Sequence, residues 1–157
     1  MLLYAPTSVL SRQSLSLATS NSLQRSQVPY LIDFNATNRI LRARFKGRVT
    51  DDDLRDMYRV GQENVARLDP LSGITDFSEV TEVAFSPQTM RDLARTKPIM
   101  PDPRRPVIFV APTPELFGMA RMFELESGEA RPNLRVVHTV EEAYQILNVP
   151  APQFGPL

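Results

Sequence analysis

Few side chains in this sequence are of the types that make or break bonds. The chain has no cysteine and one histidine, His138, which excludes thiol catalysis, disulfides and cysteine-ligated metals. His138 could be the base of a Ser-His-Asp triad, but it follows a strand-like apolar run and we do not favour that role. The sequence holds no Gly-rich phosphate loop and no dinucleotide-binding fingerprint. We therefore predict a protein that is not an enzyme and that uses no cofactor or metal.

Ser86 is the hydroxyl with two competing interpretations. It precedes Pro87, and this pair matches the cap and the first residue of a helix, where the Ser hydroxyl contributes about 1 kcal/mol. A phosphate on Ser86 would also lie at a helix N-terminus, where free amides and the helix dipole stabilise an anion. The position therefore suits a helix cap or a phosphorylation site, and we favour the cap.

Three consecutive acids, Asp51 to Asp53, follow Thr50 and raise the question of a cation site. Hard cations need several oxygen ligands that converge on one point, whereas consecutive residues of a helix point in different directions. Thr50 is a favourable cap, and the acids would then occupy the first helical turn, where the dipole favours negative charge. We interpret this segment as the start of a helix.

The segment 95–105 carries an excess of positive charge. It contains Arg95, Lys97, Arg104 and Arg105 against Asp102, with prolines at 98, 101 and 103. The four basic residues are candidate contacts for an anion, a phosphate or an acidic membrane surface, where each charge adds about 1 kcal/mol. A solvated irregular loop is the simpler interpretation, and we favour it.

The segment 114–127 is apolar over more of its circumference than one buried helix face requires. Leu116, Met119, Ala120 and Phe123 form one stripe, while Phe117, Met122 and Leu125 lie off it. Such a helix has a wide core contact, or it presents a patch for a second copy, a partner protein or an apolar ligand. The candidate residues for that surface are Phe85, Phe117, Met119, Met122 and Phe123.

Charge and hydropathy limit the partners. The 18 basic residues balance the 18 acidic ones, which argues against binding to nucleic acid. No apolar stretch approaches the roughly 20 residues of a transmembrane helix, so we expect no transmembrane segment and a cytoplasmic setting. Residues 1–29 contain seven serines, two arginines and no acid, which favours a disordered leader over a transit peptide.

Periodicity places the remaining elements in one domain, residues 30–149, followed by an open Pro-rich tail at 150–157. Expected strands are 30–34, 39–49, 73–77, 106–111 and 134–138, and expected helices begin after Thr50, Ser86, Thr113 and Thr139. The continuous apolar run from 106 to 111 is typical of a strand covered on both faces. The order β-β-α-β-α-β-α-β-α predicts an α/β fold with a mixed, mostly parallel sheet of about five strands and about four helices.

Several segments of the domain, in this order, resemble the STAS-domain superfamily, and its SpoIIAA-like branch of anti-sigma factor antagonists in particular. The segments are ILRARFKGRVTDDDL (40–54), DFSEVTEVAFSPQTM (76–90), VIFVAPTPELFGMARMFELESG (107–128) and LRVVHTVEEAYQIL (134–147). The resemblance covers about residues 30–149. It implies the STAS fold and a non-enzymatic regulatory or signalling module that works by protein binding, with a protein partner or as a homodimer.

The phosphorylation site of the antagonists is altered in this chain. In that branch a strand ending in Asp-x-Ser is followed by Asp-Ser-Ser-Gly, whose first Ser is phosphorylated by a partner kinase. Asp76, Phe77 and Ser78 fit the strand end, but the second motif falls on residues 84–87, with Phe85 at the phosphoacceptor position. The resemblance thus implies a module without the usual phosphoacceptor. Because related folds bind apolar ligands, the alternative is a domain that binds an apolar or lipid-like ligand, possibly at a membrane surface.

Overall fold

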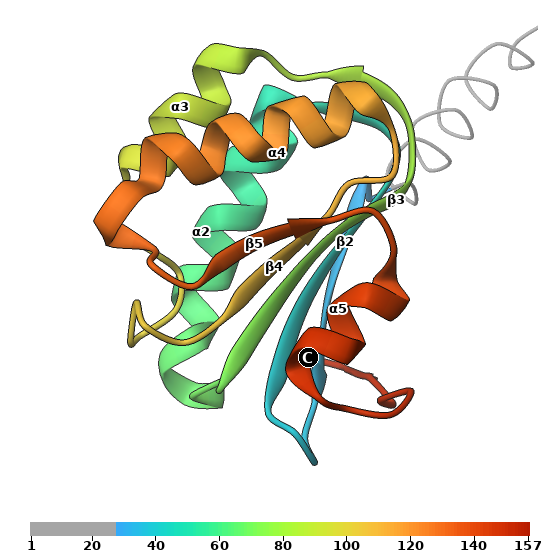
Figure 1. Cartoon of the computed structure of the whole chain (residues 1–157), viewed down its shortest axis with the longest axis vertical. Coiled ribbons are helices and arrows are strands. Elements are labelled where there is room, and N and C mark those ends of the chain that lie inside the picture. Colours follow the sequence, from blue (N-terminus) through green and yellow to red (C-terminus); the bar gives the residue numbers. More distant parts are fainter. Residues whose placement is uncertain (1–27) are drawn as a thin grey trace, which may run out of the picture.

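The computed structural model describes residues 28–157, which form a six-stranded mixed sheet and four α-helices (Figure 1). The elements are β1 (Tyr30–Asn35), β2 (Ile40–Thr50), α2 (Asp51–Leu68), β3 (Ser72–Ala84), α3 (Pro87–Arg95), β4 (Val107–Val110), α4 (Pro114–Ser127), a 3-10 turn (Gly128–Ala130), β5 (Leu134–Val137), α5 (Val140–Leu147) and β6 (Gly155–Pro156). The predicted α/β class is confirmed, as is the order of elements as far as α5. The predicted leader lies outside the described residues, apart from its last two.

The sheet has the strand order β5-β4-β3-β2-β1-β6. Strands β2, β3, β4 and β5 run parallel to one another, whereas β1 is antiparallel to both β2 and β6. Strand β4 lies between β3 and β5, and Ile108 and Val110 on it are fully buried. The prediction of a strand covered on both faces is therefore confirmed.

Helices cover both faces of the sheet (Figure 1): α2, α3 and α4 lie on one face and α5 lies on the other. On the three-helix face, Leu41, Ala43 and Phe45 alternate along β2 as expected, and all three are buried. Phe45 stacks on Phe77 with ring centroids 5.1 Å apart, and Phe77 meets Phe109 at 6.1 Å. These aromatic rings form the centre of the larger core.

Each helix begins at the side-chain cap that its sequence predicts. The hydroxyls of Thr50, Ser86, Thr113 and Thr139 each accept a hydrogen bond from the backbone amide three residues later. After Thr50 the three acids have separate partners, because Asp51 binds Ser86, Asp52 pairs with Arg55, and Asp53 completes a capping box. The interpretation of the acids as a helix start is confirmed.

Strand β3 is longer than the sequence suggested. We expected it to end at Phe77, but it continues to Ala84 and pairs in parallel with β2 as far as Thr50. Two irregularities in register, after Arg44 and after Gly47, let the strands stay together. Most side chains of residues 78–84 are exposed, and several of them are polar. In the sequence, such a polar stretch looks like a loop, and for this reason the prediction ended the strand too early.

The C-terminal tail is not open, contrary to the prediction from its prolines. Residues Gly155 and Pro156 pair with β1, and Asn35 donates a hydrogen bond from Nδ2 to the carbonyl of Gln153 at 2.5 Å. The ring of Phe154 lies 3.6 Å from the guanidinium carbon of Arg42. A cation–π contact and a short strand therefore fasten this segment to the edge of the sheet.

Candidate functional site

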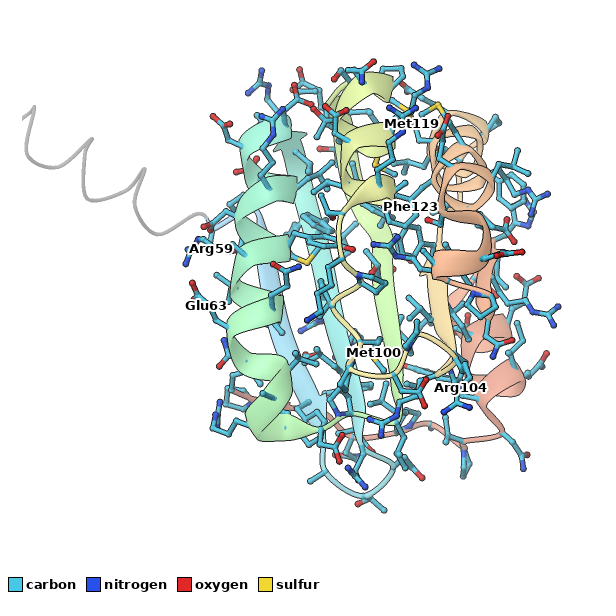
Figure 2. All side chains as sticks on the ribbon, turned by 90° about the vertical axis from the view of Figure 1, so that its left-hand side faces the viewer. Arg59, Glu63, Met100, Arg104, Met119 and Phe123 are labelled. Atoms are coloured by element: carbon cyan, nitrogen blue, oxygen red, sulfur yellow. The ribbon has the colours of Figure 1, made fainter. Side chains whose placement is uncertain are left out.

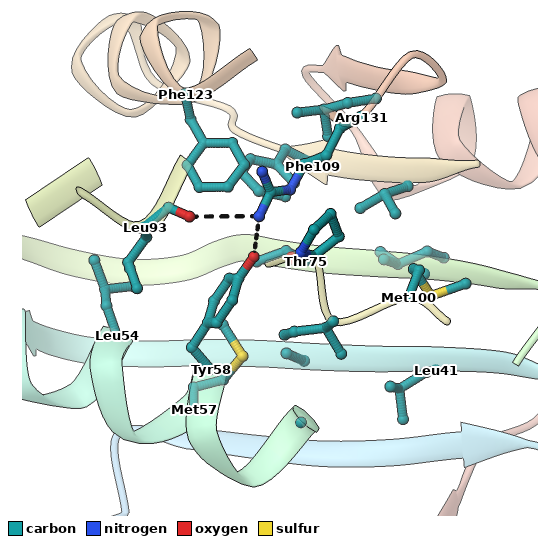
Figure 3. A pocket seen from close by; sticks show the side chains of 18 of the residues that line it. Leu41, Leu54, Met57, Tyr58, Thr75, Leu93, Met100, Phe109, Phe123 and Arg131 are labelled. Carbon is teal, nitrogen blue, oxygen red and sulfur yellow. Dashed lines mark hydrogen bonds between the residues drawn. The ribbon is translucent and has the colours of Figure 1, made fainter. Parts of the chain in front are cut away.

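A cavity of about 90 Å³ lies between the sheet and the helices α2 and α3. Its walls are almost entirely apolar, and Figure 3 shows how the side chains converge on it from separate elements. The sheet contributes Leu41, Ala43, Thr75, Phe77 and Phe109, and the helices contribute Leu54, Met57, Tyr58, Met90, Leu93 and Phe123. The cavity is thus continuous with the larger core.

The loop between α3 and β4 completes the wall of the cavity. Pro98, Ile99 and Met100 line it, and Figure 2 shows the segment around Met100 crossing in front of the sheet. Prolines at 98, 101, 103 and 106 prevent a helix here, because each lacks an amide donor and fixes its backbone. Gly61 of α2 lets Ile99 approach, since a Cβ on Gly61 would lie 2.9 Å from its Cδ1 atom.

Arg131 is the buried charge of the site, with 7% of the residue exposed. Its guanidinium donates to the carbonyls of Ala94 at 2.7 Å, Thr96 at 3.2 Å and Leu93 at 3.4 Å, all at the C-terminal end of α3. It also donates to the hydroxyls of Tyr58 and Ser127. The negative end of the α3 dipole partly balances the charge.

Among residues 28–157, no carboxylate forms an ion pair with Arg131. The guanidinium lines the cavity together with Tyr58, beside the rings of Phe109 and Phe123 (Figure 3). An apolar cavity with a few convergent polar groups is the usual form of a small-molecule site. Sequence reasoning missed Arg131, because it stands in a polar link before β5 and resembles any exposed loop arginine.

The apolar candidate residues of α4 lie partly at the cavity and partly at the margin of the core. Phe123 is buried and lines the cavity, whereas Phe117, Met119 and Met122 are partly buried at the margin of the core and do not line it. Phe117 instead stacks on His138 at 4.3 Å. Of the helix 114–127, Phe123 is the residue that reaches the cavity.

Phe85 is not part of a surface, contrary to its place among the candidate interaction residues. Only 4% of it is exposed, and its ring lies 6.2 Å from that of Phe77. The residue stands where β3 passes into α3, and its side chain belongs to the core. A partner could not contact Phe85 without disrupting the packing of this helix.

The four basic residues of the 95–105 segment do not form one anion site. Arg95 pairs with Glu126 at 3.3 Å, Arg104 with Asp102 at 3.0 Å and Arg105 with Asp69 at 2.7 Å. Hydrogen bonds from Arg104 lower the pKa of Asp102 to about 2. Lys97 has no ion pair among the residues that the structure describes, and Gln62 donates to its carbonyl at 3.1 Å. Of the four, Arg105 lines the cavity.

The surroundings of Ser86 favour the cap over the phosphorylation site. The backbone amide of Ser86 donates to the Asp51 carboxylate at 2.7 Å, and its hydroxyl lies 3.3 Å from the same oxygen. A phosphate on this hydroxyl would meet a carboxylate that already occupies the amide it would need. Like charges at that distance oppose the modification.

We expect the Asp51–Ser86 contact to appear in the pH dependence of stability. The amide of Ser86 is the main cause that lowers the pKa of Asp51 from its ordinary 3.8. A lowered pKa in the folded protein adds stability above the unfolded pKa, and that stability is lost as the pH falls through the folded pKa. The Asp51→Asn variant should therefore lose less free energy of unfolding than the parent between about pH 5 and about pH 3, measured by urea denaturation. Asp52→Asn, at a side chain 96% exposed, should follow the parent, and parent-like behaviour of both variants would refute the contact.

Two general properties of the described residues bear on function. None of the helices in residues 28–157 is long and apolar enough to span a membrane. In the same part of the chain, no three His, Asp or Glu residues are grouped so that they could hold a metal ion.

Comparison with known protein families, with curated proteins and with solved structures finds no match for this chain. The resemblance to the STAS superfamily therefore stays a prediction.

Proposed function

We propose that this domain binds a small apolar ligand in the cavity between the sheet and helices α2 and α3. The observation that carries the proposal is the cavity itself, whose free volume of about 90 Å³ is bounded by aromatic and aliphatic side chains from the sheet, from helices α2, α3 and α4, and from the loop before β4. Close packing leaves few such spaces in a domain of this size. A space of this chemistry favours an apolar molecule over water, which needs polar partners.

The volume of the cavity limits the size of the ligand. An apolar cavity of about 150 Å³ accepts benzene, so the space here suits a smaller molecule of roughly four or five heavy atoms. The loop at 96–106 has no regular secondary structure and borders the cavity. We infer that the ligand enters by local opening of this loop, because such an opening breaks no helix or strand.

Filling the cavity should abolish binding without unfolding the domain. Ala43 lines the cavity, so Ala43→Leu would place three more carbon atoms in the free space, at a stability cost below about 3 kcal/mol. We expect 1-butanol to shift the amide signals of cavity residues in the parent and to leave those of Ala43→Leu unchanged, in NMR titrations of the labelled protein. Ala66→Leu makes the same change on the exposed face of α2 and should retain binding. Undiminished binding to Ala43→Leu would place the ligand elsewhere.

A second candidate function is the STAS-like regulatory module that the sequence resembles. The order of elements from β1 to α5 supports it, because it is the order that the resemblance implies. A protein partner or second copy would meet α4 where Phe117, Met119 and Met122 are partly buried and where Leu125 is 73% exposed. Native mass spectrometry of the protein from its own host separates the candidates: a bound small molecule supports the first, and a dimer or protein complex supports the second. For the regulatory module we also propose that the protein acts in the cytoplasm.

A further inference from the structure

The charge of Arg131 has no opposite charge beside it in the described part of the chain. Its partners are three carbonyls and two hydroxyls, and these are dipoles. Removing a guanidinium from water costs several kcal/mol even after relaxation, and an anion in contact is the partner that offsets this most fully. Two of its present hydrogen bonds are long, to Leu93 at 3.4 Å and Ser127 at 3.3 Å. Each terminal nitrogen thus has one long hydrogen bond that a closer acceptor could replace, while the bonds to Ala94 and Thr96 remain.

Tyr58 supplies a second polar group at the same place. Its hydroxyl oxygen accepts a hydrogen bond from Arg131, but within residues 28–157 no group accepts the phenolic proton. The residue is buried, and buried hydroxyl protons are normally paired. The Tyr58 hydroxyl and the Arg131 guanidinium lie side by side at the cavity wall (Figure 3). Together they form a donor set that matches one carboxylate.

The remaining lining of the cavity neither competes with this donor set nor repels an anion. None of the lining residues is Asp or Glu, so a carboxylate would meet no like charge. The other lining arginine, Arg105, already donates to Asp69 at 2.7 Å and to the carbonyl of Pro70 at 2.6 Å. An acidic group entering the cavity would thus be directed to Arg131 and Tyr58, with its apolar part toward Leu41 and Met100 (Figure 3).

We propose that the ligand is a short-chain monocarboxylic acid whose carboxylate binds Arg131 and Tyr58 and whose hydrocarbon tail fills the cavity. This inference rests on the proposed binding function and specifies its ligand class. A carboxylate takes two parallel hydrogen bonds from a guanidinium, and an acid of roughly five heavy atoms, with a tail of about two carbons, matches the cavity volume. The carboxylate fixes the orientation of the ligand, and the hydrocarbon tail fills the apolar part of the cavity.

The test compares propionate with propionamide, its uncharged counterpart of nearly the same shape. The full chain is titrated with each compound, and with 1-butanol, by NMR at neutral pH and low salt. Propionate should bind at least tenfold more tightly than propionamide. Tyr58→Phe, which removes one donor and conserves the ring, should reduce that preference severalfold. Arg131→Gln should abolish it, provided that its NMR spectrum shows the native fold.

Each outcome decides one of the two proposals. If propionamide and 1-butanol bind but propionate binds no more tightly, the carboxylate inference is wrong and the apolar ligand function survives. If none of the three compounds binds, the proposed function fails as well. An unchanged preference in Tyr58→Phe, together with the same preference in Ala43→Leu, would place the acid on another part of the protein. Because the parent comparison needs no substitution, a variant that unfolds leaves the test intact.

Discussion

Replacing Phe45 with alanine should lower the free energy of unfolding by about 4 kcal/mol, within the range of phenylalanine truncations in protein cores. Phe45 is fully buried, stacks on Phe77 at 5.1 Å and also contacts the ring of Tyr30 at 5.9 Å. The truncation removes its apolar contacts and leaves a void that the surrounding sheet cannot fill. Urea denaturation followed by circular dichroism measures the change.

Phe117→Ala is the matched control for Phe45→Ala. Phe117 is partly buried and packs against His138 at the margin of the core, so its truncation should cost about 1 kcal/mol. Equal losses in the two variants would contradict the placement of Phe45 at the centre of the core. A larger loss in Phe117→Ala than in Phe45→Ala would mean that the contact of α4 with His138 stabilises the domain more than the stacking of Phe45 on Phe77.

Replacing Arg131 with methionine should lower the free energy of unfolding by about 3 kcal/mol, because buried carbonyls that lose their donor each cost about 1–3 kcal/mol. Three carbonyls at the end of α3 and the Tyr58 hydroxyl receive hydrogen bonds from this one side chain. Methionine fills similar space but offers no donor. Denaturation in urea and hydrogen exchange of the α3 amides would both report the loss.

Arg135→Met provides the comparison for Arg131→Met. Arg135 is exposed on β5, and a surface substitution of this kind usually changes stability by less than about 0.5 kcal/mol. Buried ion groups replaced by apolar side chains sometimes leave a protein more stable. A gain of stability in Arg131→Met would show that the carbonyls find other donors, and that Arg131 is retained for a purpose other than the fold.

The sequence predicts much of the fold because local signals agree with tertiary ones. The alternation of Leu41, Ala43 and Phe45 identifies a half-buried strand, and the hydroxyls of Ser86 and Thr113 mark helix starts that the structure confirms. These features depend on neighbours within a few residues. The same reasoning could not extend β3 beyond Phe77, because an exposed strand and a polar loop have similar compositions.

The candidate site was harder to predict, because it depends on residues far apart in the chain. Tyr58 and Arg131 are 73 positions apart, and neither has a local pattern that distinguishes it from ordinary helix and loop residues. Phe85 shows the opposite error, since it was expected on an interaction surface while its side chain is buried. Burial of a side chain at the junction of two elements is set by the packing of both.

The short strand β6 also has a consequence for self-association. It occupies the hydrogen-bonding edge of β1 beside Asp33 and Phe34, and Pro156 has no amide with which to recruit another chain. Without these last residues, a template for intermolecular strand addition would open next to the half-exposed Leu31. Strand β6 with its Pro156 thus protects this edge of the sheet against intermolecular strand pairing.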